Sequence, residues 1–418
     1  MKKKIVIIGG GIIGLCTAYY LNEKGHNVTI VDRSDMNSGT SYVNAGYLSP
    51  SHLIPLASPD SLKNGLKWMF DSKSPLYIKP RFSLSLLNWM YAFAKSSSNS
   101  HVNKSIPLIK DITLLSQKLY DEIKQKSDFN FHYDKKGLLM LCKSQKYLDS
   151  EGKLVDIAVS NGLKAKMVTK SDLKKIEPNI KIDAIGGSYF KCDFHTTPNE
   201  FMSDMKKYLK SSGVKIIKNT TITDINIKNG IIKNINSFEN KIYADEFVLC
   251  AGSWSSLLAK KLNLKLLLQA GKGYSINILD KTNITIPAIL SEAKVAITPM
   301  NGFTRIAGTM EIAGINKHIS KKRVDTIVNL SKNYYPDLNI KSTYINNVSS
   351  GLRPVSPDGL PYIGRSSKCD NLIIATGHAM MGWSMATATG LIVSEILEDK
   401  KLSLNIQSYS PDLSLIHI

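Results

Sequence analysis

Apolar and polar residues along the chain follow two periods, one typical of buried strands and the other of helices. Residues 4–8 are an apolar run with the length of a strand, whereas after Pro198 apolar side chains recur as on one face of a helix. The pair Asn229-Gly230 between two alternating runs predicts a β-hairpin. The other elements expected from these patterns are strands at 28–31, 214–217, 247–250 and 372–375, a mostly helical stretch with short strands over about 80–180, and helices directly after the first glycines and over about 382–397.

Glycines follow the first of these strands without a spacer. They are spaced Gly9-x-Gly11-x-x-Gly14 and open a helical stretch, and the second strand ends at Asp32. In a dinucleotide-binding turn the first glycine permits the tight turn, the second lets a phosphate approach the backbone, and the third lets the helix pack on the strand. The carboxylate can accept the hydroxyls of an adenosine ribose. This order of features predicts a dinucleotide site at a helix N-terminus.

Composition narrows the class of protein. With 418 residues, 43% of them hydrophobic and 21% charged, the chain is long enough for two globular domains. The net charge of +20 comes from dispersed lysines, so we interpret it as a solvated surface and expect no nucleic-acid partner. The five cysteines are scattered and form no CxxC motif, so we expect neither a dithiol redox motif nor a metal site. Such cysteines are typical of a reducing compartment, and we expect a cytoplasmic protein.

Two stretches bear on membranes. The lysines at 2–4 before the first apolar run resemble the start of a signal peptide, but glycines break that run and no cleavage motif follows, so we expect the segment to be retained. No apolar run reaches the ~18–20 residues of a membrane span. Residues 84–95 are apolar and aromatic and end at a lysine. A core helix is the interpretation that we favour for them, and peripheral contact with the inner face of the cytoplasmic membrane is the alternative.

The predicted elements divide the chain into two discontinuous domains. The dinucleotide-binding pattern occupies residues 1–50, 193–265 and 348–418, and we assign residues 51–192 and 266–347 to a substrate domain. Only one strand-GxGxxG-helix unit occurs. Enzymes that pass hydride from a nicotinamide to FAD usually need two, so the single unit favours a cofactor that the substrate itself reduces.

Several further segments are distinctive in composition and order. They are residues 40–46 (TSYVNAG), 248–254 (VLCAGSW), 272–275 (KGYS), 308–311 (GTME), 351–359 (GLRPVSPDG), 377–378 (GH) and 382–383 (GW). Together with the first glycines, and over nearly the whole chain, they resemble the FAD-dependent D-amino-acid oxidase superfamily, in particular the bacterial D-amino-acid dehydrogenase small subunits. The resemblance implies an α/β fold similar to p-hydroxybenzoate hydroxylase, with a discontinuous Rossmann-type FAD-binding domain and an antiparallel sheet that forms the substrate domain.

The resemblance also implies which residues contact FAD. Residues 44–46 would pass the central flavin ring, and Gly377 and the helix from Gly382 would bring backbone N–H groups to the pyrimidine edge. Gly351 stands where some relatives attach the flavin to a cysteine, so noncovalent FAD is expected. The expected FAD-binding residues are Gly9, Gly11, Ile12, Ile13, Gly14, Asp32, Arg33, Ser41, Asn44, Ala45, Gly46, Ala251, Gly252, Trp254, Gly377, Gly382 and Trp383.

Four residues are candidates for substrate chemistry. Arg353 is the expected carboxylate anchor, because its fork fits a carboxylate with two parallel hydrogen bonds; a structural pair with Asp358 is the alternative. His378 lies in the glycine loop beside the flavin, or is a satisfied histidine at a strand end. Tyr274 and His52 would line the pocket, or are scaffold residues. We expect no catalytic base if the amine binds neutral.

The resemblance implies oxidative deamination of a D-amino acid to a 2-oxo acid and ammonia. Hydride would pass from Cα to flavin N5, and electrons would then go to a quinone or another acceptor. One alternative keeps the scaffold and changes the substrate to a secondary amine or imino acid, such as sarcosine, glycine, D-proline or hydroxy-D-proline. An alternative of another class is a non-catalytic flavin-holding protein at a membrane.

Overall fold

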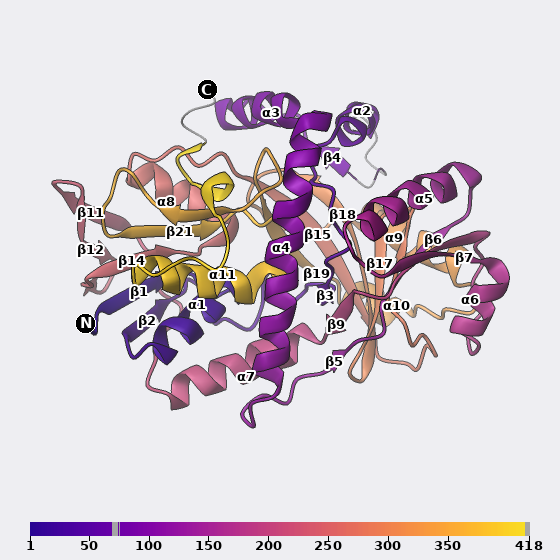
Figure 1. Ribbon diagram of the computed structural model, residues 1–418, viewed down its shortest axis with the longest axis horizontal. Helices are drawn as coiled ribbons and strands as arrows, with labels where there is room; N and C mark the ends of the chain where they lie inside the picture. The colour runs from indigo at the N-terminus through magenta and orange to yellow at the C-terminus, as the bar shows by residue number, and fades with distance from the viewer. Residues whose placement is uncertain (69–73, 75, 414–418) are drawn as a thin grey trace.

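Two large sheets form the centre of the molecule, on either side of a long helix. The computed structural model describes residues 1–68, 74 and 76–413. Helix α4 (Asn99–Lys124) crosses the middle of the view, with β1, β14 and β21 on one side and β6, β7 and β17 on the other (Figure 1).

The first sheet carries the predicted dinucleotide-binding turn. Its order is β10-β2-β1-β14-β21-β20, parallel except for the antiparallel pair β20–β21. Its strands are β10 (Lys215–Ile217), β2 (Asn27–Val31), β1 (Lys4–Ile8), β14 (Glu246–Leu249), β21 (Leu372–Thr376) and β20 (Tyr362–Arg365). Helices α1 (Ile12–Glu23), α7 (Pro198–Ser211) and α11 (Gly382–Leu397) belong to the same half. The helices predicted from residues 12, 198 and 382 are confirmed.

Close packing at the first turn explains why its third glycine is needed. A Cβ on Gly14 would lie 1.9 Å from the carbonyl oxygen of Gly9. Helix α1 also touches α11, where a Cβ on Gly390 would lie 2.6 Å from the backbone of Cys16. These contacts seat the N-terminus of α1 directly at the end of β1.

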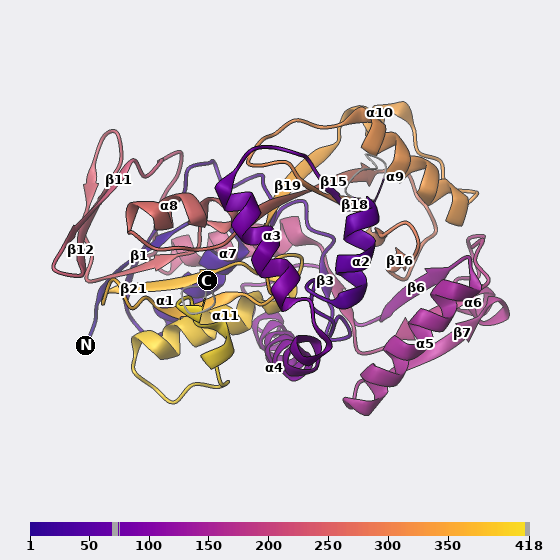
Figure 2. The same ribbon diagram turned by 90° about the horizontal axis from the view of Figure 1, so that it is seen from above.

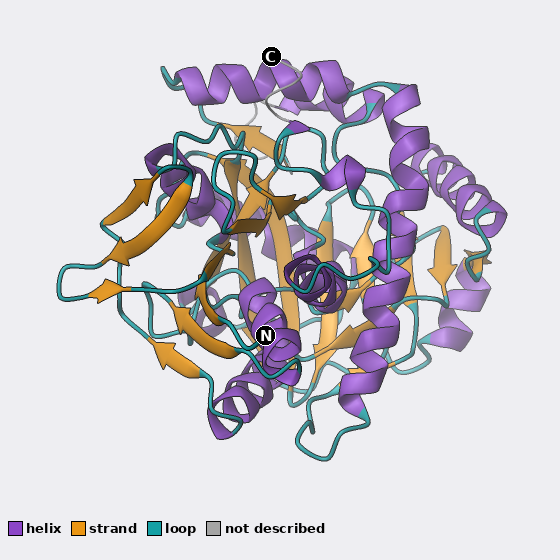
Figure 3. Ribbon diagram, turned by 60° about the vertical axis from the view of Figure 1, so that its left-hand side comes forward, coloured by secondary structure: helices purple, strands orange, loops and turns teal. Residues whose placement is uncertain are grey.

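The second sheet has nine strands and is mainly antiparallel. Its order is β19-β15-β18-β17-β16-β6-β8-β7, with β4 beside β18; only β16–β6 and β18–β4 are parallel. Its strands are β19 (Ser349–Val355), β15 (Gln269–Ile278), β18 (Phe303–Ile312), β17 (Val295–Met300), β16 (Ala288–Leu290), β6 (Leu138–Cys142), β8 (Gly186–Phe190), β7 (Ala165–Thr169) and β4 (Leu76–Ile78). Figure 3 shows long strands through the middle of the molecule, with helices in front of them and around them.

Smaller elements complete the fold. The predicted hairpin is confirmed as β11 (Asp224–Lys228) and β12 (Ile231–Asn236), which pair with β13 (Lys241–Ile242) at one end of the molecule (Figure 2). Strands β3 (Tyr47–Leu48), β9 (Phe194–Thr196) and β5 (Tyr133–Asp134) form another small sheet. The remaining elements are α2 (Pro59–Trp68), α3 (Leu84–Ser96), α5 (Gln145–Ser160), α6 (Lys170–Ile176), α8 (Ser255–Lys261), α9 (Lys321–Tyr334), α10 (Ser342–Asn346), η1 (Gly252–Trp254) and η2 (Gln407–Tyr409).

The predicted fold class, a Rossmann-type domain with a second antiparallel sheet, is confirmed. All six strands of the first sheet fall within 1–50, 193–265 and 348–418. Two elements pack against the half of the molecule to which the expected domain division does not assign them. Strand β19 pairs with β15 in the second sheet, and α4 buries Ile112 and Tyr120 in the core of the first half. Both differences arise because strand pairing and helix packing join segments that are far apart in sequence.

Helix α3 is neither a fully buried core helix nor a membrane span. Its Trp89 and Phe93 are buried, whereas Leu84, Leu87 and Tyr91 are exposed. Across the described part of the chain, no helix combines the length and apolarity that crossing a membrane requires.

Candidate active site

A cavity of about 600 Å³ lies at the carboxyl ends of the strands in the first sheet. Its wall includes the residues that end β1, β2 and β21 and the residue that follows β14, and it reaches β19 of the second sheet. In open α/β sheets this edge is where ligands bind. The cavity therefore joins the predicted dinucleotide site to the second sheet.

The glycine turn is fixed by the carboxylate of Asp32. The N–H of Gly10 donates to Asp32 Oδ2 at 2.7 Å, and the N–H and Oγ of Ser34 both donate to Oδ1 at 2.7 Å. Two carboxylate oxygens offer about four acceptor positions, so three donors leave room for a ribose hydroxyl. The first N–H of α1, that of Ile12, donates to Ser41 Oγ at 3.0 Å.

A stacked pair closes the wall beyond Asp32. The guanidinium of Arg33 lies over the ring of Trp254, 4.3 Å from its centroid. Both side chains line the cavity, together with Thr220, whose N–H donates to the carbonyl of Asp32. A flat aromatic surface beside a ribose-binding carboxylate suits a purine ring.

The N-terminus of α11 faces the same cavity. Gly382 and Trp383 line the wall, and the positive end of this 16-residue helix favours negative charge nearby. His378 precedes it and is 2% exposed; its Nε2 lies 3.0 Å from Thr389 Oγ1, and its Nδ1 has no hydrogen-bond partner among the residues that the structure describes. Burial lowers the pKa of His378 to about 3, so the ring is neutral near pH 7. An unpartnered ring nitrogen in the wall fits a polar ligand atom.

Arg353 enters the cavity from β19. It donates to the carbonyl of Thr309 at 2.8 Å, and it forms no ion pair with a carboxylate of any described residue. Asp358, the alternative partner, instead accepts the N–H of Leu360 at 3.1 Å. Burial lowers the pKa of Arg353 to about 10, which leaves the guanidinium charged at neutral pH. A charged fork without a carboxylate is suited to an anionic ligand.

A β-bulge aims the carbonyl that holds Arg353. The pairing of β15 with β18 shifts register between Lys272 and Tyr274, and Thr309 on β18 has φ 62°. Such a φ is strained for a β-branched residue, and bulges of this kind re-aim groups beside functional sites. Thr309 lies in the distinctive segment 308–311, but nothing in the sequence marks the bulge or the contact with Arg353, because both depend on the pairing of β15 with β18.

Tyr274 and Lys272 do not face Arg353. A Cβ on Gly273 would lie 2.4 Å from Nη1 and Nη2 of Arg353, so Gly273 faces the guanidinium. Because side chains alternate along a strand, Tyr274 and Lys272 point to the other side of the sheet. Neither lines the cavity.

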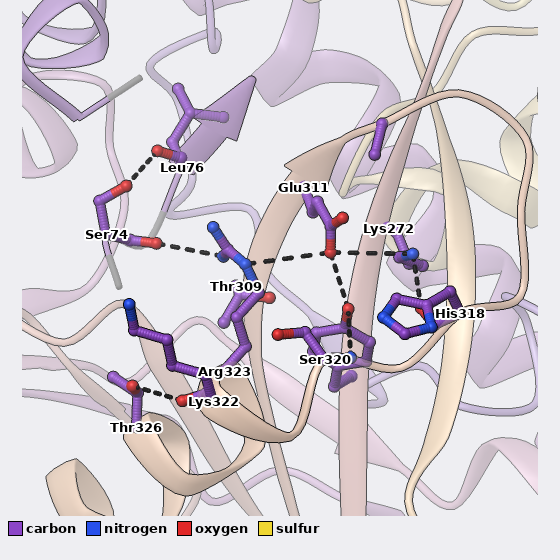
Figure 4. Close-up of polar contacts among 12 residues, drawn as sticks. Ser74, Leu76, Lys272, Thr309, Glu311, His318, Ser320, Lys322, Arg323 and Thr326 are labelled. Atoms are coloured by element: carbon purple, nitrogen blue, oxygen red, sulfur yellow. Dashed lines mark hydrogen bonds and ion pairs between the residues drawn. The ribbon is translucent and has the colours of Figure 1, made fainter. Parts of the chain in front are cut away.

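Tyr274 and Lys272 instead belong to a cluster around Glu311 (Figure 4). Glu311 Oε2 accepts the Tyr274 hydroxyl at 2.7 Å and lies 3.7 Å from Lys272 Nζ and 3.9 Å from Arg323 Nε. Lys272 Nζ also donates to the carbonyl of His318 at 2.6 Å. The cluster thereby holds the segment after β18, which brings Lys317 to the cavity wall.

His52 also lies outside the cavity wall. Its Nδ1 is 3.2 Å from Ser51 Oγ, and burial lowers its pKa to about 4. The structure brings together the predicted residues Gly9, Gly11, Ile12, Ile13, Asp32, Arg33, Ser41, Asn44, Ala251, Gly252, Trp254, Arg353, His378, Gly382 and Trp383. The predicted residues Gly14, Ala45, Gly46, Gly377, His52 and Tyr274 are not in the wall.

Other wall residues were not predicted. Thr40, Ser253, Leu352 and Pro354 lie within the distinctive segments of the sequence, so those segments carried a usable signal. Lys317 is on a loop with no motif, and no signal in the sequence marks it.

Comparison with known proteins identifies the family. Residues 4–396 match the family described as FAD dependent oxidoreductase. D-amino acid dehydrogenase of Vibrio atlanticus is 29% identical, with 99% of each chain covered, and that of Helicobacter pylori is 28% identical, with 96% of each covered.

Solved structures share the fold. Glycine oxidase from Geobacillus kaustophilus superposes with a TM-score of 0.77 at 20% identity, covering 98% of each chain. L-proline dehydrogenase from P. horikoshii gives 0.75 at 18% identity, covering 98% of this chain and 97% of that one. The cavity has the carboxylate, the two helix N-termini and the space beside Gly11 that an FAD needs, and the family match spans nearly the whole chain. The protein therefore belongs to the FAD dependent oxidoreductase family and is an oxidoreductase with FAD as its cofactor.

Proposed function

We propose that the protein oxidises a free D-amino acid at Cα. The product would be an imino acid, which water converts to a 2-oxo acid and ammonia, and the electrons would go to a quinone or another acceptor. FAD supplies the two-electron acceptor for this reaction. The residues of the chain would bind the substrate, orient it and keep the site dry.

The observation that carries the proposal is the free fork of Arg353. Among the described residues this guanidinium donates to the carbonyl of Thr309, and it offers its remaining N–H groups to a substrate carboxylate. The opposing N-terminus of α11 would stabilise negative charge on the cofactor side. His378, neutral at pH 7, would provide a fixed polar contact and no proton.

The choice of substrate draws support from relatives named D-amino acid dehydrogenase. A carboxylate anchor by itself fits glycine, sarcosine or D-proline equally well, so the substrate must be tested directly. We expect the FAD to be noncovalent, since Gly351 offers no nucleophile and a Cβ there would lie 2.8 Å from Thr40 Cα.

The test is anaerobic reduction of the purified, FAD-loaded enzyme. D-amino acids, their L-enantiomers, glycine, sarcosine and D-proline are added separately while the visible flavin absorption is recorded. We expect bleaching by D-amino acids, and much weaker bleaching in Arg353→Lys, whose point charge cannot form the bidentate contact. Bleaching by dithionite shows that each variant is loaded. Reduction by L-amino acids or by secondary amines alone would reject the substrate proposed.

We further propose that α3 contacts a lipid surface, where a quinone would be reached. Its outward side presents Leu84, Leu87 and Tyr91, which are 79%, 57% and 65% exposed, and Phe82 just before it is fully exposed. Lys95 follows at the end of the helix. An exposed apolar helix face beside a cation suits the interface of an anionic membrane.

A further inference from the structure

Two histidines and an aspartate meet in the small sheet between the two halves of the molecule. His132 precedes Tyr133 at the start of β5, and Asp134 ends that strand; antiparallel pairing places Asp134 opposite His195 of β9. Figure 1 shows these strands beside α4. Residues two apart on a strand share a face, so all three side chains lie on one side of the sheet.

The possible ligand atoms are close together. One ring nitrogen of each histidine and a carboxylate oxygen of Asp134 all lie within 4.8 Å of one another. His132 Nε2 is 3.4 Å from Asp134 Oδ2, which is about the edge of a tetrahedron with bonds of ~2.0–2.1 Å. The rings of His132 and His195 have centroids 5.3 Å apart.

His195 gives a second, independent indication of a ligand. Its exposed fraction is 0%, and within the described part of the chain neither ring nitrogen has a hydrogen-bond partner of normal geometry. A weak interaction with the backbone of Pro299 can engage at most one of the two ring nitrogens. Buried polar side chains are normally satisfied, so an unpartnered imidazole that faces a histidine and a carboxylate requires an explanation.

We propose that His132, Asp134 and His195 bind a divalent transition metal of the zinc class. The ligands would be His132 Nε2, an oxygen of Asp134 and a ring nitrogen of His195, with water in the remaining position. Two imidazoles and one carboxylate suit Zn²⁺ or Co²⁺ better than the oxygen-preferring Mg²⁺ or Ca²⁺.

The surroundings agree with this ligand set. Thr197 Oγ1 lies 3.1 Å from His132 Nδ1 and so orients the ring with Nε2 toward Asp134, as partners of metal-binding histidines commonly do. Lys136 Nζ lies 2.8 Å from Asp134 Oδ2, but this lysine is 50% exposed and can turn to solvent when a metal binds.

The position points to a structural role. Thr196 follows His195 in β9. Its backbone N–H donates to the carbonyl of Gly46 at 2.8 Å, and its Oγ1 accepts the indole N–H of Trp383 at 2.8 Å. A metal would therefore tie β5 to β9 directly behind the loop at 44–46 and the start of α11.

The test uses the untagged, FAD-loaded enzyme after dialysis against a chelator. Titration with Zn²⁺ should show one tight site per chain and a higher Tm, and Co²⁺ should give the visible absorption of tetrahedral coordination. Asp134→Asn and His132→Gln should each weaken Zn²⁺ binding by roughly tenfold or more and remove the Tm shift. Both residues are partly exposed, so these variants avoid the folding risk of changing His195.

A matched control separates this site from ordinary histidine–carboxylate pairs. His26 Nε2 lies 2.7 Å from Glu398, and no described residue adds a third ligand there, so Glu398→Gln should leave Zn²⁺ binding unchanged. Equal binding by the wild type, Asp134→Asn and His132→Gln would overturn the proposal. Absence of stoichiometric Zn²⁺ and Co²⁺ uptake by the wild type would do the same.

Discussion

The guanidinium of Arg353 lies directly over Gly273. A Cβ on that glycine would come within 2.4 Å of both terminal nitrogens. Gly273 thus provides the space in which the guanidinium lies, and the bulge at Thr309 provides the carbonyl that orients it.

Replacement of Gly273 by alanine should displace the anchor without unfolding the protein. The colliding atoms are the end of a flexible side chain, so Arg353 can move aside, but it then leaves the carbonyl of Thr309. We expect KM for the D-amino acid to rise roughly tenfold or more, with a smaller change in kcat and normal FAD content. Steady-state kinetics measure this, and Arg353→Ala gives the limiting effect. If KM were unchanged in Gly273→Ala, the position of Arg353 would not matter for substrate binding, and the assignment of Arg353 as the carboxylate anchor would be wrong.

Replacing Gly11 and replacing Gly14 of the first turn should affect different properties, FAD binding in one case and folding stability in the other. A Cβ on Gly11 meets only Ser41 Oγ at 3.4 Å, so Gly11→Val should fold but fill the space of the pyrophosphate and yield apoprotein. A Cβ on Gly14 collides with backbone, so Gly14→Ala should lower the thermal stability of the protein itself. Flavin absorption and thermal unfolding distinguish the two. A fully yellow Gly11→Val protein would contradict the assignment.

His378 should make the protein less stable below pH 6.5. Its folded-state pKa is lowered to about 3, so on acidification the unfolded chain takes up a proton that the folded state does not. The free energy of unfolding should then fall by up to ~1.4 kcal/mol per pH unit from this residue. His378→Gln should flatten the dependence measured by chemical denaturation at several pH values.

Asp193 offers a control, because its contribution to stability should change with pH in the direction opposite to that of His378. Burial raises its pKa to about 7, although Ser51 Oγ donates to it at 2.5 Å. Between its ordinary pKa of 3.8 and about 7 the folded state holds the extra proton, so its contribution to stability falls as pH rises. Asp193→Asn should therefore steepen the loss of stability on acidification. For His378, the contradicting result would be a free energy of unfolding that depends on pH in His378→Gln in the same way as it does in the wild type. That result would mean that His378 is not held neutral in the folded protein.

Tyr274 should matter for stability more than for turnover. Tyr274→Phe removes the hydroxyl that donates to Glu311 but leaves Lys272 and Arg323 beside that carboxylate. We expect a loss of about 1–3 kcal/mol in the free energy of unfolding and a kcat/KM within about twofold of the wild type. A large rise in KM in Tyr274→Phe would instead indicate that Tyr274 contributes to substrate binding.

Lipid binding should depend on the outward side of α3. Leu87→Glu with Tyr91→Glu should reduce co-sedimentation with anionic phospholipid vesicles by roughly tenfold or more. Phe238→Glu is the matched control, because this residue is 88% exposed on another part of the surface. Trp89 is unsuitable as a probe, since its indole N–H donates to the carbonyl of Val355 at 2.9 Å. Equal sedimentation of all variants would exclude α3 as the contact.

The sequence by itself determined the first βαβ unit, the hairpin at Asn229-Gly230, the helix at 382–397 and part of the cavity wall. These features depend on neighbouring residues, because strand and helix periods and glycine turns are local properties of the chain. The order of the motifs was enough for the family, and hence for the cofactor.

Only the tertiary structure decided which residues meet across the two sheets. The strand register puts Gly273 under Arg353 and turns Tyr274 away from the cavity, and the bulge at Thr309 breaks the regular pairing. His195 reaches His132 and Asp134 only because β9 pairs with β5. Contacts between distant segments follow from packing and register, which no short stretch of sequence encodes.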